Sequence, residues 1–285
     1  VTLAEKSGQG PLPTWKEIYE FFGVVDVDET QAPVHVRILD VGAADSILIS
    51  GEECHILIDA GTSAQGDKIV RDMEKLGVSH LDLVIVTHPH ADHIGGMERV
   101  LRSVAVDKLV MPEPPDSLIP TTPSYLGMLE AIEEREIPSI RAQAGQQFQF
   151  GDLRLEILHA GTQQDSTDNL NDLSVVVRMT YGDVSFLFMG DSEEETEQEI
   201  LQSGVECRAD VLKLGHHGSN TSTTPAFLSA VSPSAAAISC GQHAPPGDRV
   251  LELLRKREIS YYRTDLDGRI TFATDGKTID TMLEK

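Results

Sequence analysis

The sequence is poor in basic residues, in cysteine and in aromatic residues. Only 23 lysines and arginines stand against 46 acidic residues, which gives a formal net charge of −23 at pH 7. Sequence-independent binding of nucleic acid requires a basic stripe or patch, and the sequence contains none. The excess of negative charge repels long polyanions, so the composition disfavours long nucleic acid as a partner.

Cysteines and long apolar runs are also scarce. Cys54, Cys207 and Cys240 are odd in number and far apart, which argues against a disulfide framework or a CxxC metal site. Cys54 and Cys240 lie in apolar, strand-like runs and are expected to be buried free thiols, which favours the cytoplasm. No apolar run approaches the ~20 residues that a membrane span requires. The sequence begins at Val1 without a signal-peptide pattern, and export stays open if a leader has been removed.

The rest of the composition suits one large α/β domain. Hydrophobic residues form 40% of the 285 residues, which is enough for a substantial core. Residues 1–33 are expected to be a leader segment, and residues 34–285 one globular domain in which runs of branched residues alternate with helical patterns. The expected helices are Gly66–Leu76, Tyr125–Glu136 and Glu193–Leu201. The expected strands are Val34–Leu39, Ser46–Ser50, Cys54–Ile58, Leu83–Val86, Lys108–Met111, Gln147–Phe150, Leu153–Leu158, Ser174–Met179, Val184–Met189, Val211–Leu214, Ala235–Ser239, Tyr261–Arg263 and Ile270–Ala273.

Four metal-capable side chains fall within six residues, directly after an expected buried strand. They are His88, His90, Asp92 and His93, and Gly95-Gly96 follows them. A turn there projects the first two side chains to one side and the last two to the other. Neutral imidazole and carboxylate are the usual nitrogen and oxygen ligands of Zn²⁺ in catalytic sites. The run therefore predicts a metal centre at the end of the strand.

Two later expected strands also end in metal-capable residues. The apolar run Phe186–Met189 is followed by Gly190 and Asp191. Taken alone, Asp191 is well explained as the N-cap of the next helix, but beside the histidine run it is better explained as a carboxylate that bridges two metals. His216 and His217 follow the strand that ends at Leu214. Adjacent residues there point in different directions, so one of these histidines is expected to be a ligand.

These three strand-end elements, HxHxDH, GD and H, resemble the metallo-β-lactamase superfamily. Within it, the runs Asp40–Ser46, Leu57–Gly61 and His216–Ser219 are similar to the soluble hydrolase domain of the ComEC/Rec2 competence proteins. Stand-alone relatives such as the phosphorylcholine esterases are similar too. The resemblance covers about residues 34–275 and implies an α/β fold, the αββα four-layer sandwich, with the site along one sheet edge.

The resemblance also implies two Zn²⁺ ions, with Mn²⁺ or Fe as alternatives because such donor sets accept all three. It implies that His88 and His90 bind one ion, that Asp92 and His93 bind the other, and that Asp191 bridges them. Asp92 is also expected to take part in catalysis. No serine or cysteine nucleophile is needed, because a hydroxide that bridges the two metals attacks the substrate.

Several further positions follow from the same resemblance. His216 is expected to complete the second metal site, because it comes first after its strand, and His217 is then a catalytic residue that faces substrate. The third ligand of the ion held by His88 and His90 is expected to be His159, with Asn171 as the alternative. Asp59 is expected to be a buried carboxylate that orients a ligand imidazole, or else a turn residue before Gly61.

The expected function is that of a dinuclear metal-dependent hydrolase, with a phosphoesterase or phosphodiesterase favoured. Ser219, Asn220, His243 and Arg263 are candidates for substrate binding, although turn chemistry explains the first two and a plain loop residue explains His243. One alternative function is hydrolysis of a carbon acyl bond, as in lactonases, thioesterases or β-lactamases. Another is a non-catalytic metal-binding module. The charge favours a small phosphoester or a cell-wall type of substrate.

Overall fold

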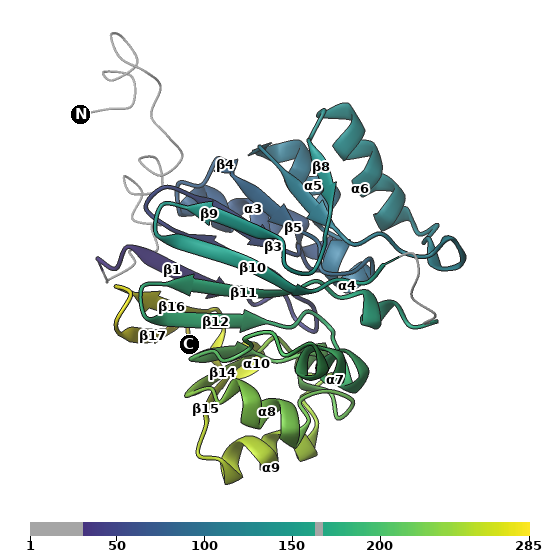
Figure 1. The fold of residues 1–285 in the computed structure, drawn as a ribbon. Helices are drawn as coiled ribbons and strands as arrows, with labels where there is room; N and C mark the ends of the chain where they lie inside the picture. Colours follow the sequence, from purple (N-terminus) through teal and green to yellow (C-terminus); the bar gives the residue numbers. More distant parts are fainter. Residues whose placement is uncertain (1–30, 163–167) are drawn as a thin grey trace, which may run out of the picture.

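Two β-sheets stacked face to face, with helices on both outer faces, make up the described part of the chain (Figure 1). The computed structural model describes residues 31–162 and 168–285. The expected leader, residues 1–33, lies almost wholly outside the described residues. The layers run helix, sheet, sheet, helix, which confirms the expected αββα sandwich. Among the described residues, no helix is both long enough and apolar enough to cross a membrane.

The first sheet has eight strands in the order β17-β16-β1-β2-β3-β5-β7-β8. Strands β3, β5, β7 and β8 are parallel, and the remaining neighbours are antiparallel. Its strands are β1 (Val34–Ile38), β2 (Ile47–Ser50), β3 (His55–Ile58), β5 (Leu83–Ile85), β7 (Leu109–Met111), β8 (Ser139–Arg141), β16 (Ile270–Thr274) and β17 (Ile279–Leu283). The helices of this half are α3 (Gly66–Lys75), α4 (Ala91–Ile94), α5 (Met97–Ser103) and α6 (Pro123–Glu134). A small separate sheet pairs β4 (His80–Leu81) with β6 (Ala105–Val106).

The second sheet has seven strands in the order β15-β14-β13-β12-β11-β10-β9. Strands β12 to β15 are parallel to one another, and β9 to β12 are antiparallel. Its strands are β9 (Gln147–Phe150), β10 (Leu153–His159), β11 (Val176–Tyr181), β12 (Val184–Phe188), β13 (Val211–Lys213), β14 (Ala235–Ile238) and β15 (Ser260–Arg263). The helices of this half are α7 (Glu194–Ser203), α8 (Pro225–Val231), α9 (Asp248–Lys256) and α10 (Thr264–Asp267). Short 3₁₀ turns are η1 (Ser63–Gln65), η2 (Asp116–Leu118), η3 (Leu170–Leu173) and η4 (His216–Gly218).

The alternation of side chains along each strand explains the layers. In β3, Ile56 and Ile58 pack in the core between the sheets, while Leu57 packs under the helices of the first half. In β12, Phe186 and Phe188 face the other sheet, while Leu187 packs under α7 and its neighbours. Successive side chains of a strand point to opposite faces, so a strand covered on both sides must be apolar throughout. This is why Ile56–Ile58 of β3 and Phe186–Phe188 of β12 are continuous apolar runs.

Most expected strands differ from the observed ones by one or two residues at their ends. Four strands were not expected: β4, β6, β8 and β17. They are short or lie at sheet edges, and β17 is only partly buried. A strand of this kind owes its order to pairing with a neighbour, so its own sequence carries little periodicity. Helix α8 was also not expected, although Thr224 caps it and Pro225 opens it.

Candidate metal centre

The histidine run lies where β5 gives way to the short helix α4. His88 and His93 are fully buried, and His90 is the extended residue that precedes α4. Helix α4 then carries Asp92 and His93 on consecutive positions. A Cβ atom on Gly96 would lie 2.3 Å from the carbonyl oxygen of Ala60, so only glycine lets this segment approach β3 so closely. The glycine pair therefore lets the histidine run lie close against the end of β3.

One group of donors, here called the first group, consists of His88, His90 and Asp191. One ligand atom from each lies within 4.8 Å of the others. His88 Nε2 is 2.9 Å from His90 Nδ1 and 3.8 Å from Asp191 Oδ2. Asp191 follows β12 of the other sheet, so the group joins the two halves of the sandwich.

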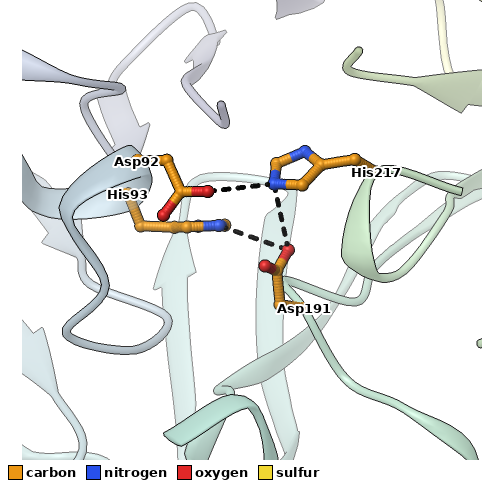
Figure 2. A group of neighbouring side chains, drawn as sticks. All are labelled: Asp92, His93, Asp191 and His217. Atoms are coloured by element: carbon orange, nitrogen blue, oxygen red, sulfur yellow. Dashed lines mark ion pairs between the residues drawn. The ribbon is translucent and has the colours of Figure 1, made fainter. Parts of the chain in front are cut away.

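The second group consists of Asp92, His93, Asp191 and His217, and it also meets within 4.8 Å (Figure 2). His93 Nε2 lies 3.2 Å from Asp191 Oδ1. His217 Nε2 lies 3.4 Å from Asp92 Oδ2 and 3.6 Å from Asp191 Oδ1. Asp191 therefore turns one carboxylate oxygen toward each group.

Three buried atoms at the centre of the second group have no hydrogen-bond partner among the described residues. They are His93 Nε2, Asp191 Oδ1 and His217 Nε2. Each buried polar atom without a partner costs about 1–3 kcal/mol, so three at one point are a costly arrangement for a purely structural cluster. Imidazole nitrogens and carboxylate oxygens are the donors that a divalent transition metal takes. The residues present therefore fit a metal ion.

The pKa shifts of His88 and of the carboxylates suit the same role. Burial lowers the pKa of His88 well below its usual value, which keeps its imidazole neutral and able to donate a lone pair. Burial would raise the pKa of Asp92, but the imidazole of His217, 3.4 Å away, brings it down to about 2. Burial likewise opposes ionisation of Asp191, yet neighbouring His93 holds the pKa of that carboxyl well below its usual value. The carboxylates of both groups are thus charged at neutral pH. Against the effect of burial, Asp191 raises the pKa of His93 well above its usual value and Asp92 raises that of His217, so a metal ion would replace a proton on these two imidazoles.

Asp59 fixes the orientation of His93 from behind. Its Oδ2 accepts a hydrogen bond from His93 Nδ1 at 2.7 Å and another from the Thr87 hydroxyl at 2.6 Å. Its Oδ1 accepts from the Thr87 backbone N–H at 2.8 Å. With Nδ1 engaged, the Nε2 atom of His93 points into the second group. The left-handed φ of 57° at Asp59 shows that it also makes the turn before Gly61.

The structure corrects the choice between the adjacent histidines. His217 lies in the second group, whereas His216 lies outside both groups and hydrogen-bonds through Nδ1 to Glu193 Oε1 at 2.7 Å. Both residues have a left-handed backbone, with φ of 44° and 54°. This double turn carries the first side chain away from the centre and brings the second one in. His217 Nδ1 donates to the Ser239 carbonyl at 3.0 Å, which leaves Nε2 facing the group.

His159, the further ligand expected beside His88 and His90, does not join the first group. His159 lies outside both groups, because its Nδ1 donates to the Ser174 carbonyl at 3.0 Å and its Nε2 lies 3.2 Å from Glu199 Oε2. A register shift at the end of β10, between Ile157 and His159, carries the side chain toward α7. The rival residue, Asn171, lies beside the first group. Burial lowers the pKa of His90, and the Asp92 carboxylate and, more weakly, the Asn171 side chain oppose that shift.

The four candidates for substrate binding lie outside both groups. Ser219 Oγ accepts from the Thr221 hydroxyl at 3.0 Å, as turn chemistry predicts, and the Asn220 carbonyl accepts from the distant Arg249 at 2.7 Å. His243 is exposed in the turn between Gly241 and Ala244. Arg263 donates through both Nε and Nη2 to Asp265, at 3.0 and 2.7 Å, so its guanidinium already has a carboxylate partner.

Lys213 and Glu193 were not predicted from the sequence as neighbours of the site, whereas Asp45 lies in the run Asp40–Ser46 that carried the resemblance. Lys213 and Asp45 form a buried ion pair beside the second group, and Glu193 accepts from His216 next to it. Lys213 had a visible signal, because a lone lysine inside an apolar strand must have a partner if the strand is buried. Cys54 and Cys240 are buried and free, as expected, and Cys207 is buried and free as well.

The fold and these two donor groups define an αββα sandwich with buried His/Asp groups at its junction that could hold metal ions. Residues 39–243 match the metallo-beta-lactamase superfamily, and the chain therefore belongs to that superfamily. The resemblance seen in the strand-end motifs is thus confirmed.

The competence-protein resemblance is confirmed as well. The chain is 30% identical over 263 residues to ComE operon protein 3 of Bacillus subtilis (strain 168), covering 83% of this chain and 32% of that protein. It is 33% identical over 251 residues to competence protein ComA of Neisseria gonorrhoeae, covering 86% of this chain and 33% of that protein. The chain thus spans about a third of the length of these curated relatives.

Solved structures share the fold. CmlA, named a diiron β-hydroxylase from Streptomyces venezuelae, superposes with a TM-score of 0.55 at 12% identity, over 91% of this chain and 59% of that one. The metallo-beta-lactamase fold protein YhfI from Bacillus subtilis gives a TM-score of 0.51 at 13% identity, over 81% and 96% of the two chains. At these identities the similarity shows the fold alone.

Proposed function

We propose that the chain is a dinuclear metal-dependent hydrolase that acts on phosphoesters. One observation carries the proposal: three buried, unpartnered donor atoms converge in the second group, and the first group meets the other oxygen of the same Asp191 carboxylate. A shared carboxylate between two histidine-rich groups is the arrangement that a pair of divalent ions requires. The ligands are proposed as two sets that share Asp191: His88 and His90 for one ion, and Asp92, His93 and His217 for the other.

Divalent ions at such a site supply a water of lowered pKa and stabilise negative charge that develops on the substrate. The chain's own residues hold the donors in place. Asp59 fixes His93 and the Ser239 carbonyl fixes His217, in each case through Nδ1. Such outer contacts set the tautomer and the orientation of the ligand imidazole. Zinc is the proposed metal, with manganese or iron as alternatives for the same donor set; CmlA, which shares the fold, is named a diiron enzyme.

A polar wall beside the second group is proposed to face the substrate. Glu193 Oε1 accepts from His216 at 2.7 Å and from the Thr221 hydroxyl at 2.5 Å. Arg249 donates to the carbonyl oxygens of Asn220 and Ser222, which fixes the same loop from the other side. A loop held at both ends presents its hydroxyl and amide groups with little entropic cost. Ser219 and Asn220 remain the proposed contacts to a phosphate there.

The phosphoester preference rests on the similarity to competence proteins together with the charge. A chain with a net charge of −23 repels long nucleic acid, while a small anionic ester can reach a centre that two divalent ions make positive. A small phosphodiester or a cell-wall type of ester is therefore the proposed substrate class. Hydrolysis of carbon acyl bonds and a metal-binding module without activity are the competing outcomes of the test.

The test has two stages. Metal analysis of the purified chain, reconstituted with zinc and with manganese, is expected to give two ions per chain. Bis(p-nitrophenyl) phosphate is then compared with a chromogenic cephalosporin and an acyl thioester. Turnover of the phosphodiester that is lost in Asp191→Asn supports the proposal. Turnover of the lactam or thioester alone would replace it with the acyl hydrolase, and two bound ions without any turnover would replace it with the binding module.

A further inference from the structure

A buried ion pair lies directly behind the second group. Lys213 ends β13, and Asp45 lies in the loop between β1 and β2, so the pair joins the two sheets. Lys213 Nζ is 2.8 Å from Asp45 Oδ2 and also donates to the Leu214 carbonyl at 2.9 Å. The two side chains are 1% and 2% exposed. A fully buried ammonium is expensive to desolvate, and such pairs often add no stability over an apolar replacement. Its position therefore calls for another explanation.

Asp45 contacts the second group with its free oxygen and with its backbone. Its Oδ1 is buried, has no hydrogen-bond partner and lies 3.6 Å from His217 Nδ1. Its backbone N–H donates to the Asp92 carbonyl at 3.2 Å. One oxygen of its carboxylate also lies within 4.8 Å of Asp59 and His93. Asp45 is thus a charged acceptor within easy reach of the imidazole that completes the group.

The orientation of the His217 imidazole depends on the hydrogen bond at Nδ1, because Nε2 has no hydrogen-bond partner among the described residues. The backbone of His217 is left-handed, with φ of 54° and ψ of 25°, a conformation that disfavours any residue with a Cβ. Its Nδ1 donates to the neutral Ser239 carbonyl at 3.0 Å. A carboxylate is a stronger acceptor than a neutral carbonyl. If Asp45 were free to move by about half an ångström, it would compete with Ser239 for this hydrogen.

We propose that Lys213 is a positioning residue for His217, and that it acts through Asp45. By binding Oδ2, Lys213 holds the Asp45 carboxylate away from the histidine. His217 Nδ1–H then keeps its hydrogen bond to the Ser239 carbonyl, and Nε2 stays directed at Asp92 and Asp191. This inference rests on the proposed metal centre, because one of its tests measures metal affinity. It adds Lys213 and Asp45 to that centre as residues that act from behind the ligands.

The test compares Lys213→Met with the double variant Lys213→Met/Asp45→Asn. Zinc affinity is measured by competition with a fluorescent chelator, which resolves the two ions. In Lys213→Met one ion is expected to bind about tenfold or more weakly, the range typical of residues that orient metal ligands. The other ion, in the first group, keeps its affinity. The double variant removes the competing charge and is expected to recover most of the lost affinity. Lys68→Met is the control, because Lys68 pairs with Asp72 on the surface.

A merely structural role gives a different pattern. If both ions weaken equally, or if the double variant is as weak as the single one, the proposal is overturned. A crystal structure of metal-free Lys213→Met gives a second readout that needs no metal: the His217 imidazole is expected to move from Ser239 to Asp45, and an unmoved ring overturns the proposal. Fewer than two ions in the unmodified chain would instead contradict the proposed metal centre, and the metal-free structures would still decide the role of Lys213.

Discussion

At the scale of single residues, His216 and His217 show how the backbone decides between two identical side chains. Both adopt left-handed φ values, which cost a non-glycine residue about 1–3 kcal/mol each. Residues held in such conformations concentrate at functional sites, where the surrounding contacts over-determine them. Here Glu193 holds the first histidine and Ser239 the second. The turn is conformationally unfavourable, and it brings only one of the two imidazoles to the second group.

The two histidines therefore form a matched pair for mutation. His217→Ala is expected to lose one of the two ions, and phosphodiester hydrolysis should fall by about a hundredfold or more, because a metal is worth several kcal/mol of charge stabilisation. His216→Ala is expected to keep both ions. Metal analysis and steady-state kinetics on both variants check this. Loss of an ion in His216→Ala with retention in His217→Ala would reverse the assignment made from the geometry.

The same pair shows what a sequence can and cannot predict about this site. The donor types at the ends of β5, β12 and β13 were predicted from the sequence, because each follows a recognisable apolar run. The sign of φ at His216 was not, because positive φ is uncommon for any residue other than glycine and two adjacent histidines give no sign of it. His159 was misplaced for a related reason: a register shift at the end of β10 decides where its side chain points.

At the scale of elements, the burial of the histidine run depends on how closely α4 and α5 approach β3. Gly96 has φ of −85° and ψ of −6°, which any residue can adopt, so its role is purely steric. A Cβ there would meet the Ala60 carbonyl oxygen at 2.3 Å and Gly66 Cα at 3.0 Å. Both contacts are with backbone, which cannot rotate away. Helices α3, α6 and α7 and the central strands were predictable from their apolar patterns. The close approach of α5 to β3 was visible in the sequence only as a glycine pair.

Gly96→Ala and Gly204→Ala separate the steric role of glycine from its conformational role. Gly204 has φ of 69° at the end of α7, with open space around its Cα. Its substitution is expected to cost about 1 kcal/mol, from the left-handed backbone alone. Gly96→Ala is expected to cost about 3 kcal/mol through overpacking and to weaken metal binding as well. Urea unfolding of both variants measures the difference. Equal losses of stability would mean that α5 can shift outward without disturbing the site.

At the scale of the whole molecule, the metal centre lies where the two halves of the sandwich meet. The donors His88, His90, Asp92 and His93 follow β5 of the first sheet, while Asp191 and His217 follow strands of the second. Without a cation, the carboxylates of Asp92 and Asp191 face each other across this junction in a chain that already carries a net charge of −23. Bound ions would relieve this repulsion and link the halves, so metal binding and folding should be coupled.

This coupling gives the last prediction. A ligand that binds only the folded chain stabilises it by RT ln(1 + [L]/Kd), which is about 2.7 kcal/mol at a hundredfold excess over Kd. Zinc at that excess is expected to raise the free energy of unfolding by this amount for each ion, relative to the same chain in a chelator. Asp191→Asn is expected to lose most of the gain, because Asp191 serves both groups, while His216→Ala keeps it. Denaturant unfolding with and without zinc measures all three. If the unmodified chain binds two ions and its unfolding does not change, the donor groups must persist in the unfolded chain or lie elsewhere than at the junction of the two sheets.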